Sequence, residues 1–315
     1  MTTLPQHPPE GTGRLRPSAA VARAARSLAA SGVGPARVEA ELLAAYVLGV
    51  PRGRLALADD LGADELARLD ELVRRRAGRE PLQHLTGRAA FRHLELAVGP
   101  GVFVPRPETE LLAGWGVEQA RGRPDPLVVD LCSGSGAIAL AVAQELPGAR
   151  VVAVERSPEA LVWLRRNAAE RAAAGDRPIG VVEADVTAPD LLAELAGRVD
   201  VLLCNPPYVP VEVVVPPEVA AHDPAEAVFG GADGLAVIRP VIARAAALLR
   251  PDGVVGVEHD DTHGAAVPGL LVADGRFTAV AEHRDLTGRP RYATASRRAD
   301  GQHAPGAAAW QTDSS

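Results

Sequence analysis

A short motif, Asn205-Pro206-Pro207-Tyr208, directly follows an apolar run that ends at Cys204. Its residue types suit a planar NH₂ group whose lone pair is delocalised, as in an amide or an aromatic amine. The Asn205 side-chain oxygen and the Pro206 carbonyl could accept hydrogen bonds from such a group and aim its nitrogen at an electrophile. Two prolines fix the backbone and remove competing N–H donors, and Tyr208 offers a flat surface. The motif predicts nitrogen alkylation by positioning and preorganised polarity, and a proline-rich loop that merely ends the strand is the alternative.

A second motif, residues 128–137 (VVDLCSGSGA), predicts a strand, a turn of small residues and the start of a helix. Gly134 and Gly136 would let the backbone approach a ligand closely, and the helix N-terminus favours an anionic group. The motif alone is ambiguous, because a nicotinamide-binding turn and a tight turn without ligand contain similar residues.

Acidic residues after the next two strands help to decide which ligand this turn would bind. One strand ends at Glu155, whose carboxylate could accept both hydroxyls of a ribose, and Asp185 follows the next strand at a common adenine-side position. With Asp130, three acidic residues thus lie at the ends of adjacent strands. The spacing resembles that of class I S-adenosylmethionine-dependent methyltransferases, although Cys132 replaces the usual first glycine. The resemblance implies S-adenosylmethionine bound without metal by Asp130, Cys132, Ser133, Gly134, Ser135, Gly136, Glu155, Asp185, Val186 and Asn205.

Strand and helix patterns alternate from residue 127 onward. Strands are predicted at 127–131, 150–155, 179–183, 199–204 and 253–258, helices at 137–146, 158–174 and 235–249, and a terminal antiparallel pair at 277–282 and 291–296. Continuous apolar strands separated by helices predict an α/β fold with a mostly parallel sheet covered on both faces. Such sheets bind ligands beyond the carboxyl ends of their strands, where the strand order reverses. The class I resemblance implies a Rossmann-like sheet of seven strands.

Residues 18–87 show helical periodicity instead and predict a small N-terminal domain. Its helices are expected at 18–30, 35–49 and 64–77. The arginines at 74–76 favour a solvated helix end over a docking surface for an acidic partner.

Residues 88–105 predict a β-hairpin linker, because apolar residues come near-alternately around a turn at Gly99-Pro100-Gly101 and continue through 102–104. The methyltransferase domain is then expected at 106–298. The polar, Pro- and Gly-rich ends, residues 1–17 and 299–315, are predicted to be disordered tails.

Composition limits the partners. A formal net charge of −7 weighs against binding mainly through phosphates, which requires a basic surface. Cys132 and Cys204 lie in apolar runs and are expected to be free thiols rather than a disulfide or metal site. The sequence shows neither the apolar core of a signal peptide nor a membrane-length apolar stretch, so we expect a soluble cytoplasmic protein and a monomer.

Further motifs resemble the release factor glutamine methyltransferase family (HemK/PrmC). They are residues 78–87 (GREPLQHLTG) followed by Phe91, residues 104–110 (VPRPETE), residues 223–224 (DP) with 230–235 (GGADGL), and residues 39–43 (EAELL). The resemblance covers about residues 20–298, and several motifs in the correct order make it specific. Glu258-His259-Asp260 departs from the Glu-x-Gly expected after the fifth strand.

The resemblance implies methylation of N5 of the glutamine in the Gly-Gly-Gln motif of class 1 peptide chain release factors, which the N-terminal domain helps to hold. Carried over residue by residue, Asn205, Pro206, Pro207 and Tyr208 bind the glutamine, and Asn205, Pro206 and Tyr208 are the catalytic set. Arg106, Pro107 and Glu110 line the entrance to that pocket. A structural ion pair of Arg106 and Glu110 that braces the loop is an equal alternative.

Three rival functions stay open. A nucleic-acid amino-methyltransferase, acting on adenine for example, should carry a basic, aromatic-rich groove, whereas this chain is acidic and 3% aromatic. A non-catalytic binding protein could retain the fold, but the intact motif at 205–208 argues against it. A related enzyme that methylates a glutamine of another protein is hardly separable by sequence.

Overall fold

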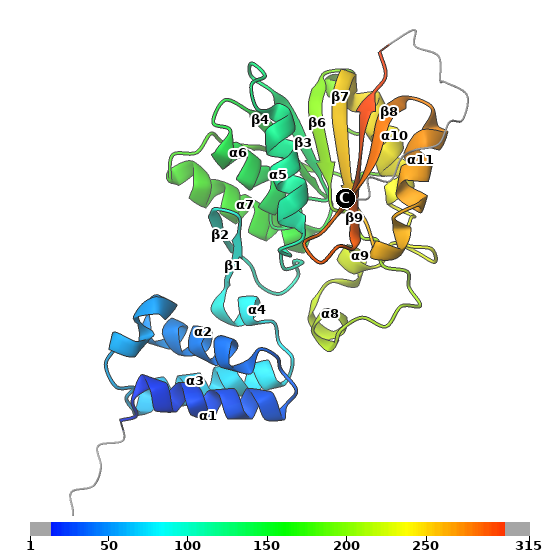
Figure 1. Ribbon diagram of the computed structural model, residues 1–315. Helices are drawn as coiled ribbons and strands as arrows, with labels where there is room; N and C mark the ends of the chain where they lie inside the picture. The colour runs from blue at the N-terminus through cyan, green and yellow to red at the C-terminus, as the bar shows by residue number, and fades with distance from the viewer. Residues whose placement is uncertain (1–13, 300–315) are drawn as a thin grey trace, which may run out of the picture. The chain divides into compact units, whose positions relative to one another are not determined.

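Seven strands form one sheet in the C-terminal part of the chain, in the order β5-β4-β3-β6-β7-β9-β8 (Figure 1). The computed structural model describes residues 14–299 and divides the chain into two units, one ending at Thr86 and the other beginning at Gly87. The strands are β3 (Leu127–Leu131), β4 (Arg150–Glu155), β5 (Gly180–Glu183), β6 (Val199–Cys204), β7 (Leu249–Glu258), β8 (Phe277–Arg284) and β9 (Pro290–Arg297).

The sheet is mostly parallel, which confirms the predicted class I methyltransferase fold. The pairs among β5, β4, β3, β6 and β7 are parallel, and β9 runs antiparallel to both β7 and β8. All five residues of β3 are buried, as expected for a strand covered on both faces. The chain builds outward from β3 through β4 to β5 and then crosses to β6 on the other side of β3, so the strand order reverses between β3 and β6.

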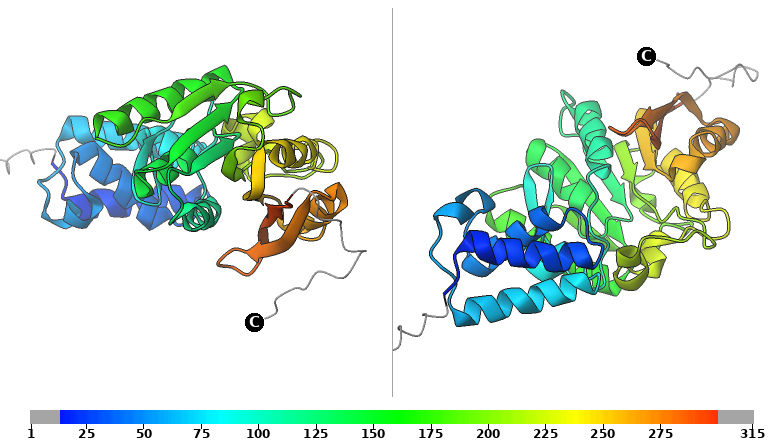
Figure 2. Two further views of the ribbon diagram at one scale, coloured as in Figure 1. Left: turned by 90° about the horizontal axis from the view of Figure 1, so that it is seen from above. Right: turned by 60° about the horizontal axis from the view of Figure 1, so that its bottom comes forward.

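Helices cover both faces of the sheet. One layer consists of α5 (Thr109–Ala120), α6 (Ala137–Glu145) and α7 (Pro158–Ala173), and the other of α10 (Ile238–Leu248) and α11 (Ala266–Asp274) (Figures 1 and 2). Shorter helices are η2 (Ala193–Leu195), α8 (Pro217–His222), α9 (Ala225–Val228) and η3 (Asp261–His263). In α5, Gly116 permits close packing on the sheet, because a Cβ at this position would lie 2.5 Å from Leu203 Cδ1.

The hairpin is formed earlier in the chain than predicted. It pairs β1 (Arg88–Phe91) with β2 (Leu94–Ala97), and its turn contains Arg92 with φ 51°. The predicted turn at residues 99–101 is present, with the Val102 N–H bonded to the Gly99 carbonyl at 3.4 Å, but it does not close the hairpin, and the strand predicted at 102–104 is wrong. Gly99 and Gly101 instead allow close approach to α7, since added Cβ atoms would lie 2.5 Å from Trp163 Cζ2 and 2.8 Å from Glu159 Cβ.

The N-terminal unit is helical. Its described helices are α1 (Pro17–Ala30), α2 (Ala36–Leu48), η1 (Arg52–Leu57), α3 (Ala63–Ala77) and α4 (Leu82–Thr86). Leu28, Leu43 and Leu69, one from each long helix, are fully buried in its core. Arg76 is also buried and forms a 2.5 Å ion pair with Glu39 of α2, so the predicted solvated helix end is wrong at this residue.

Most of the two predicted tails lies outside the described residues, which begin at 14 and end at 299. Residues 14–17 are an exception. Leu15 forms a β-bridge with Leu61, and Pro17 begins α1. The predicted N-terminal tail therefore extends too far at its inner end.

Candidate active site

The two predicted motifs meet at the point where strand order reverses. The glycine loop (residues 132–136) follows β3, and the amide loop (residues 205–208) follows β6. Because Leu131 and Cys204 pair in register on adjacent parallel strands, Cys132 and Asn205 are the next residues on each side. The geometry thus places a small-residue turn beside an amide-binding motif at the carboxyl edge of the sheet.

Left-handed backbone shapes the glycine loop. Cys132, Gly134 and Gly136 have φ values of 59°, 55° and 87°. Gly136 is required for packing, because an added Cβ would lie 2.6 Å from Leu164 Cδ1, whereas Gly134 borders open space. Cys132 thus holds a left-handed conformation that favours glycine, the residue that usually stands at this position of the motif.

Asp130 lies beneath the glycine loop at the end of β3 and is fully buried. Its Oδ2 accepts the Ala139 N–H of α6 at 3.2 Å, while Oδ1 has no hydrogen-bond partner within residues 14–299. Burial raises the pKa of this carboxyl to about 7, against the opposing effects of the nearby Ser133 side chain and of the hydrogen bond from Ala139. Ser135 Oγ is also buried without a partner in the described chain. Polar atoms without protein partners therefore lie at the loop.

Glu155 braces the same loop. Its Oε2 accepts the Gly134 N–H at 2.8 Å, and its Oε1 accepts the N–H groups of Arg156 and Ser157, each at 2.8 Å. A carboxylate has about four lone-pair sites, so about one remains for a ligand hydroxyl. Glu155 thus positions the loop in addition to its predicted contact with a ribose.

Asp185 follows β5 and is less enclosed. Its Oδ1 accepts the Thr187 N–H at 2.8 Å, and its Oδ2 pairs with Arg156 at 3.2 Å. Hydrogen bonds from Thr187, and then the pairing with Arg156, lower the pKa of this carboxyl. Val186 beside it is buried. Two strands, β4 and β3, thus separate the predicted adenine-side residues from the amide loop, at the same edge of the sheet.

The amide loop is held by buried polar contacts. Asn205 Nδ2 donates to Thr109 Oγ1 at 3.1 Å, and the Tyr208 hydroxyl donates to Glu258 Oε1 at 3.0 Å. Pro206 and Pro207 are buried. The backbone behind them is crowded, since a Cβ on Gly230 would lie 2.6 Å from the Pro207 carbonyl oxygen. These contacts fix the four residues that were predicted to bind an amide.

Glu258 at the end of β7 is a residue of this site that the sequence reasoning did not assign. It is 1% exposed, and burial raises its pKa to about 7, although interactions with Thr109 and Tyr208 oppose the shift. Burial, followed by the nearby charge of Glu258, raises the pKa of Tyr208, so this phenol keeps its proton. Thr109 was also missed, although it lies within the motif at 104–110 that carried the family resemblance.

The three residues predicted to line the pocket entrance have different partners and different exposure. Arg106 Nη2 pairs with Asp223 Oδ2 at 2.7 Å, and its guanidinium lies 4.8 Å from the centre of the Phe103 ring. Glu110 accepts the backbone N–H of Arg92 at 3.0 Å, in the turn of the β1–β2 hairpin. Pro107 is exposed. Arg106 is therefore in a structural ion pair, but with Asp223 rather than with Glu110 as the alternative reading expected.

Cys132 and Cys204 are free thiols, as predicted. The Cys204 thiol is fully buried, and burial followed by a hydrogen bond with Cys132 raises its pKa well above the ordinary value. Both side chains thus belong to the junction of the glycine loop and β6.

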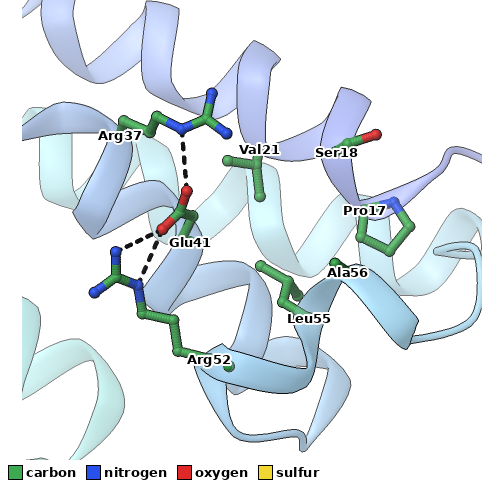
Figure 3. Close-up of a pocket in the computed structure, with 9 residues that line it drawn as sticks. Pro17, Ser18, Val21, Arg37, Glu41, Arg52, Leu55 and Ala56 are labelled. Carbon is green, nitrogen blue, oxygen red and sulfur yellow. Dashed lines mark hydrogen bonds and ion pairs between the residues drawn. The ribbon is translucent and has the colours of Figure 1, made fainter.

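A separate pocket of about 450 Å³ lies in the N-terminal unit. Figure 3 shows Glu41 between Arg37 and Arg52, to which it is joined by hydrogen bonds of 3.1 and 2.7 Å. The hydrogen bond from Arg52 is the main cause of a lowered Glu41 pKa. None of the residues that line this pocket was among those predicted to bind the cofactor or the glutamine.

Within residues 14–299, no helix is long and apolar enough to cross a membrane. In the same part of the chain, no group of three or more His, Cys, Asp or Glu side chains could hold a metal ion.

Comparisons with known proteins agree with this geometry. The model of the PrmC N-terminal domain matches residues 19–87, and that of the methyltransferase small domain matches residues 111–217. Among solved structures, the hMettl16 catalytic domain in complex with the MAT2A 3'UTR hairpin 6 has a TM-score of 0.50 at 18% identity, over 67% of this chain and 78% of that one. At this identity, the likeness shows the fold alone.

Curated relatives are more similar to this chain in sequence than that solved structure is. The protein named release factor glutamine methyltransferase in Mycolicibacterium smegmatis is 55% identical over 90% of this chain and 98% of its own length. Proteins of the same name in Streptomyces coelicolor and Deinococcus radiodurans are 50% and 38% identical, covering 89% and 87% of this chain and 97% and 96% of theirs. Since such relatives span nearly the whole chain, the protein belongs to the release factor glutamine methyltransferase family.

Proposed function

We propose that this protein transfers a methyl group from S-adenosylmethionine to N5 of the glutamine in the Gly-Gly-Gln motif of class 1 peptide chain release factors. The observation that carries the proposal is the junction of the glycine loop and the amide loop where strand order reverses. The family assignment supports the choice of a release factor over other substrates with an NH₂ group.

The residues at the glycine loop fit S-adenosylmethionine. Asp130 Oδ1 and Ser135 Oγ are buried polar atoms without partners in the described chain, and Gly134 borders open space. We assign the cofactor to Asp130, the glycine loop, Glu155, Asp185 and Val186, without a metal ion. When bound, S-adenosylmethionine supplies the electrophilic methyl group.

The chain itself contributes orientation. Asn205 Oδ1 and the Pro206 carbonyl accept hydrogen bonds from the glutamine NH₂ group, and the Tyr208 ring supports the amide plane. An amide nitrogen is too weak an acid for a side-chain base to deprotonate beforehand, so it gives up its proton only after methylation has made it acidic. Catalysis therefore comes from positioning and preorganised polar groups.

We assign the docking of the release factor to the N-terminal unit, residues 18–87. It forms its own core and shares no residue with the two loops, and its match to the PrmC N-terminal domain supports a role particular to this family. Contacts remote from the reacting amide raise the rate by orienting it. The release factor should therefore be a far better substrate than a short Gly-Gly-Gln peptide. We further propose that the protein works as a cytoplasmic monomer without binding nucleic acid.

The test is to incubate the protein with methyl-labelled S-adenosylmethionine in the presence of chelator and purified release factor, then map the labelled peptide. Label on the Gly-Gly-Gln glutamine is expected. Label that appears on an adenine-containing nucleic acid and not on the release factor would refute the assignment.

The role of Asn205 is tested with Asn205→Ala, which should lower turnover by roughly 10²–10³-fold, the scale of one preorganised polar group. Binding of the demethylated cofactor product should change much less. Turnover close to that of the unaltered protein would show that Asn205 does not orient the amide.

A further inference from the structure

We propose that Thr109 and Glu258 are positioning residues that fix the side-chain amide of Asn205 in one of its two possible orientations. The inference rests on the proposed role of Asn205. It concerns three segments that come together only in the fold: the first residue of α5, the end of β6 and the end of β7.

Buried polar groups of these three segments lie next to Asn205. Asn205 and Thr109 are joined at 3.1 Å, and Thr109 is 4% exposed. The Thr109 hydroxyl acts to lower the pKa of the Glu258 carboxyl, so it interacts with this carboxylate. Glu258 is 1% exposed, and its Oε2 is buried without a hydrogen-bond partner within residues 14–299. Water therefore has little access to replace either residue as a partner.

The direction of each hydrogen bond follows from the Glu258 carboxylate. An ionised carboxylate only accepts. Tyr208 donates to Oε1, and we infer that the Thr109 hydroxyl directs its hydrogen to the buried Oε2, which has no other partner in the described chain. A threonine hydroxyl has a single hydrogen, and once this is directed to Glu258 its oxygen can only accept from Asn205.

Asn205 must then present Nδ2 to Thr109 and leave Oδ1 for the substrate. The two ends of an asparagine amide have nearly the same shape, and hydrogen-bond partners decide which way it points. In the opposite orientation, Asn205 would turn its NH₂ group toward the NH₂ group of the glutamine. Two donors would face each other, and the acceptor that aims the substrate nitrogen would be lost.

The test compares Thr109→Val, which removes the hydroxyl at nearly constant shape, with Thr109→Ser, which keeps it. Assays are run with release factor at about pH 8.5, above the Glu258 pKa of about 7, so that Glu258 is ionised. We expect Thr109→Val to lower kcat by roughly 10–100-fold, the scale for misplacing a reacting group. The KM for release factor should change less than about threefold, because Thr109 lies outside the unit to which docking is assigned. Thr109→Ser should restore most of kcat.

Glu258→Gln provides a second test that does not depend on Thr109. A glutamine can donate to the Thr109 oxygen, which frees the Thr109 hydrogen to bond Asn205 Oδ1 and stabilises the wrong orientation. A fall in kcat with little change in KM is expected here too. Thr294→Val is the matched control, because Thr294 is a buried threonine on β9 whose hydroxyl bonds His283 instead.

Each outcome decides between a positioning role and a merely structural one. Equal kcat values for Thr109→Val and the unaltered protein would overturn the inference, and so would a Thr109→Ser variant as slow as Thr109→Val. A raised KM at constant kcat would assign Thr109 to docking instead. If Thr109→Val does not fold, judged by loss of binding to the demethylated cofactor product, Thr109→Ser and Glu258→Gln decide the matter. Failure of the proposed function can be told apart from failure of this inference, because the unaltered protein itself would then not methylate the release factor.

Discussion

Replacing Asp130 with asparagine should flatten the pH dependence of stability in the unit that begins at Gly87. Asp130 is fully buried, and its pKa is raised from 3.8 to about 7, chiefly by loss of hydration. Asparagine keeps an oxygen for the N–H of Ala139 and never ionises. The substitution therefore removes the titration while it preserves the one hydrogen bond that Asp130 Oδ2 accepts from α6.

The direction in which stability changes with pH follows from the number of protons that the folded and unfolded states bind. Between the pKa of the unfolded chain and that of the folded protein, the folded state holds a proton that the unfolded state has lost. Stability therefore falls as pH rises through this window, by at most about 1.4 kcal/mol per pH unit, and levels off above pH 7. From about pH 5 to about pH 8, the loss due to Asp130 is on the order of 2.5 kcal/mol. Glu258 has a similarly raised pKa, but it titrates in both proteins and cancels in the comparison.

The measurement is urea unfolding of the ligand-free protein at several pH values, followed by tryptophan fluorescence. Trp115 and Trp163 lie in the unit that begins at Gly87, and residues 1–86 contain no tryptophan. The two proteins should be similarly stable near pH 5, and the variant should be the more stable near pH 8. Glu183→Gln is the control, since it removes one acidic charge from an exposed ion pair with Arg165. Parallel pH profiles for Asp130→Asn and the unaltered protein would refute the reasoning.

Two further substitutions test the cofactor loop. Cys132→Gly should raise the free energy of unfolding by about 1 kcal/mol, because relief of a left-handed conformation outweighs the added flexibility of the unfolded chain; a lower urea midpoint would contradict this. Glu155→Ala should weaken binding of the demethylated cofactor product by about 1–2 kcal/mol in calorimetry, through loss of charge-assisted hydrogen bonds to the ligand and the loop. Unchanged affinity would remove Glu155 from the site.

Local signals predicted the central strands well, but α5 and α11, two of the helices that cover the sheet, were not predicted. The bounds of β3, β4 and β6 agree with the sequence prediction, because each is a continuous apolar run between turns or helices. Helix α5 was not predicted, since Gly114 and Gly116 lower its intrinsic helix propensity. The structure explains Gly116 by contact with Leu203, far along the chain. A contact between residues so far apart leaves no pattern in the neighbouring sequence.

The site was predictable where its residues form one motif. The amide loop was identified from four consecutive residues, but its supports come from elsewhere. Thr109 lies 96 positions from Asn205, and Glu258 lies 50 positions from Tyr208. Their partnership depends on how α5, β6 and β7 pack. The same limit affected the hairpin, because the turn at residues 99–101, whose glycines allow contact with α7, was predicted to be the one that closes it.

Asn167 determines where a catalytic fragment of this chain can begin. Its buried side chain accepts the Ala97 N–H at 2.7 Å and donates to the carbonyls of Ala97 and Ser135, each at 2.9 Å. One amide thus links strand β2 to the glycine loop. A fragment that starts after Ala97 would leave this amide with unpaired groups in the interior, at a cost of about 1–3 kcal/mol for each. One that starts at Gly87 keeps the hairpin, and with it the support of the cofactor loop.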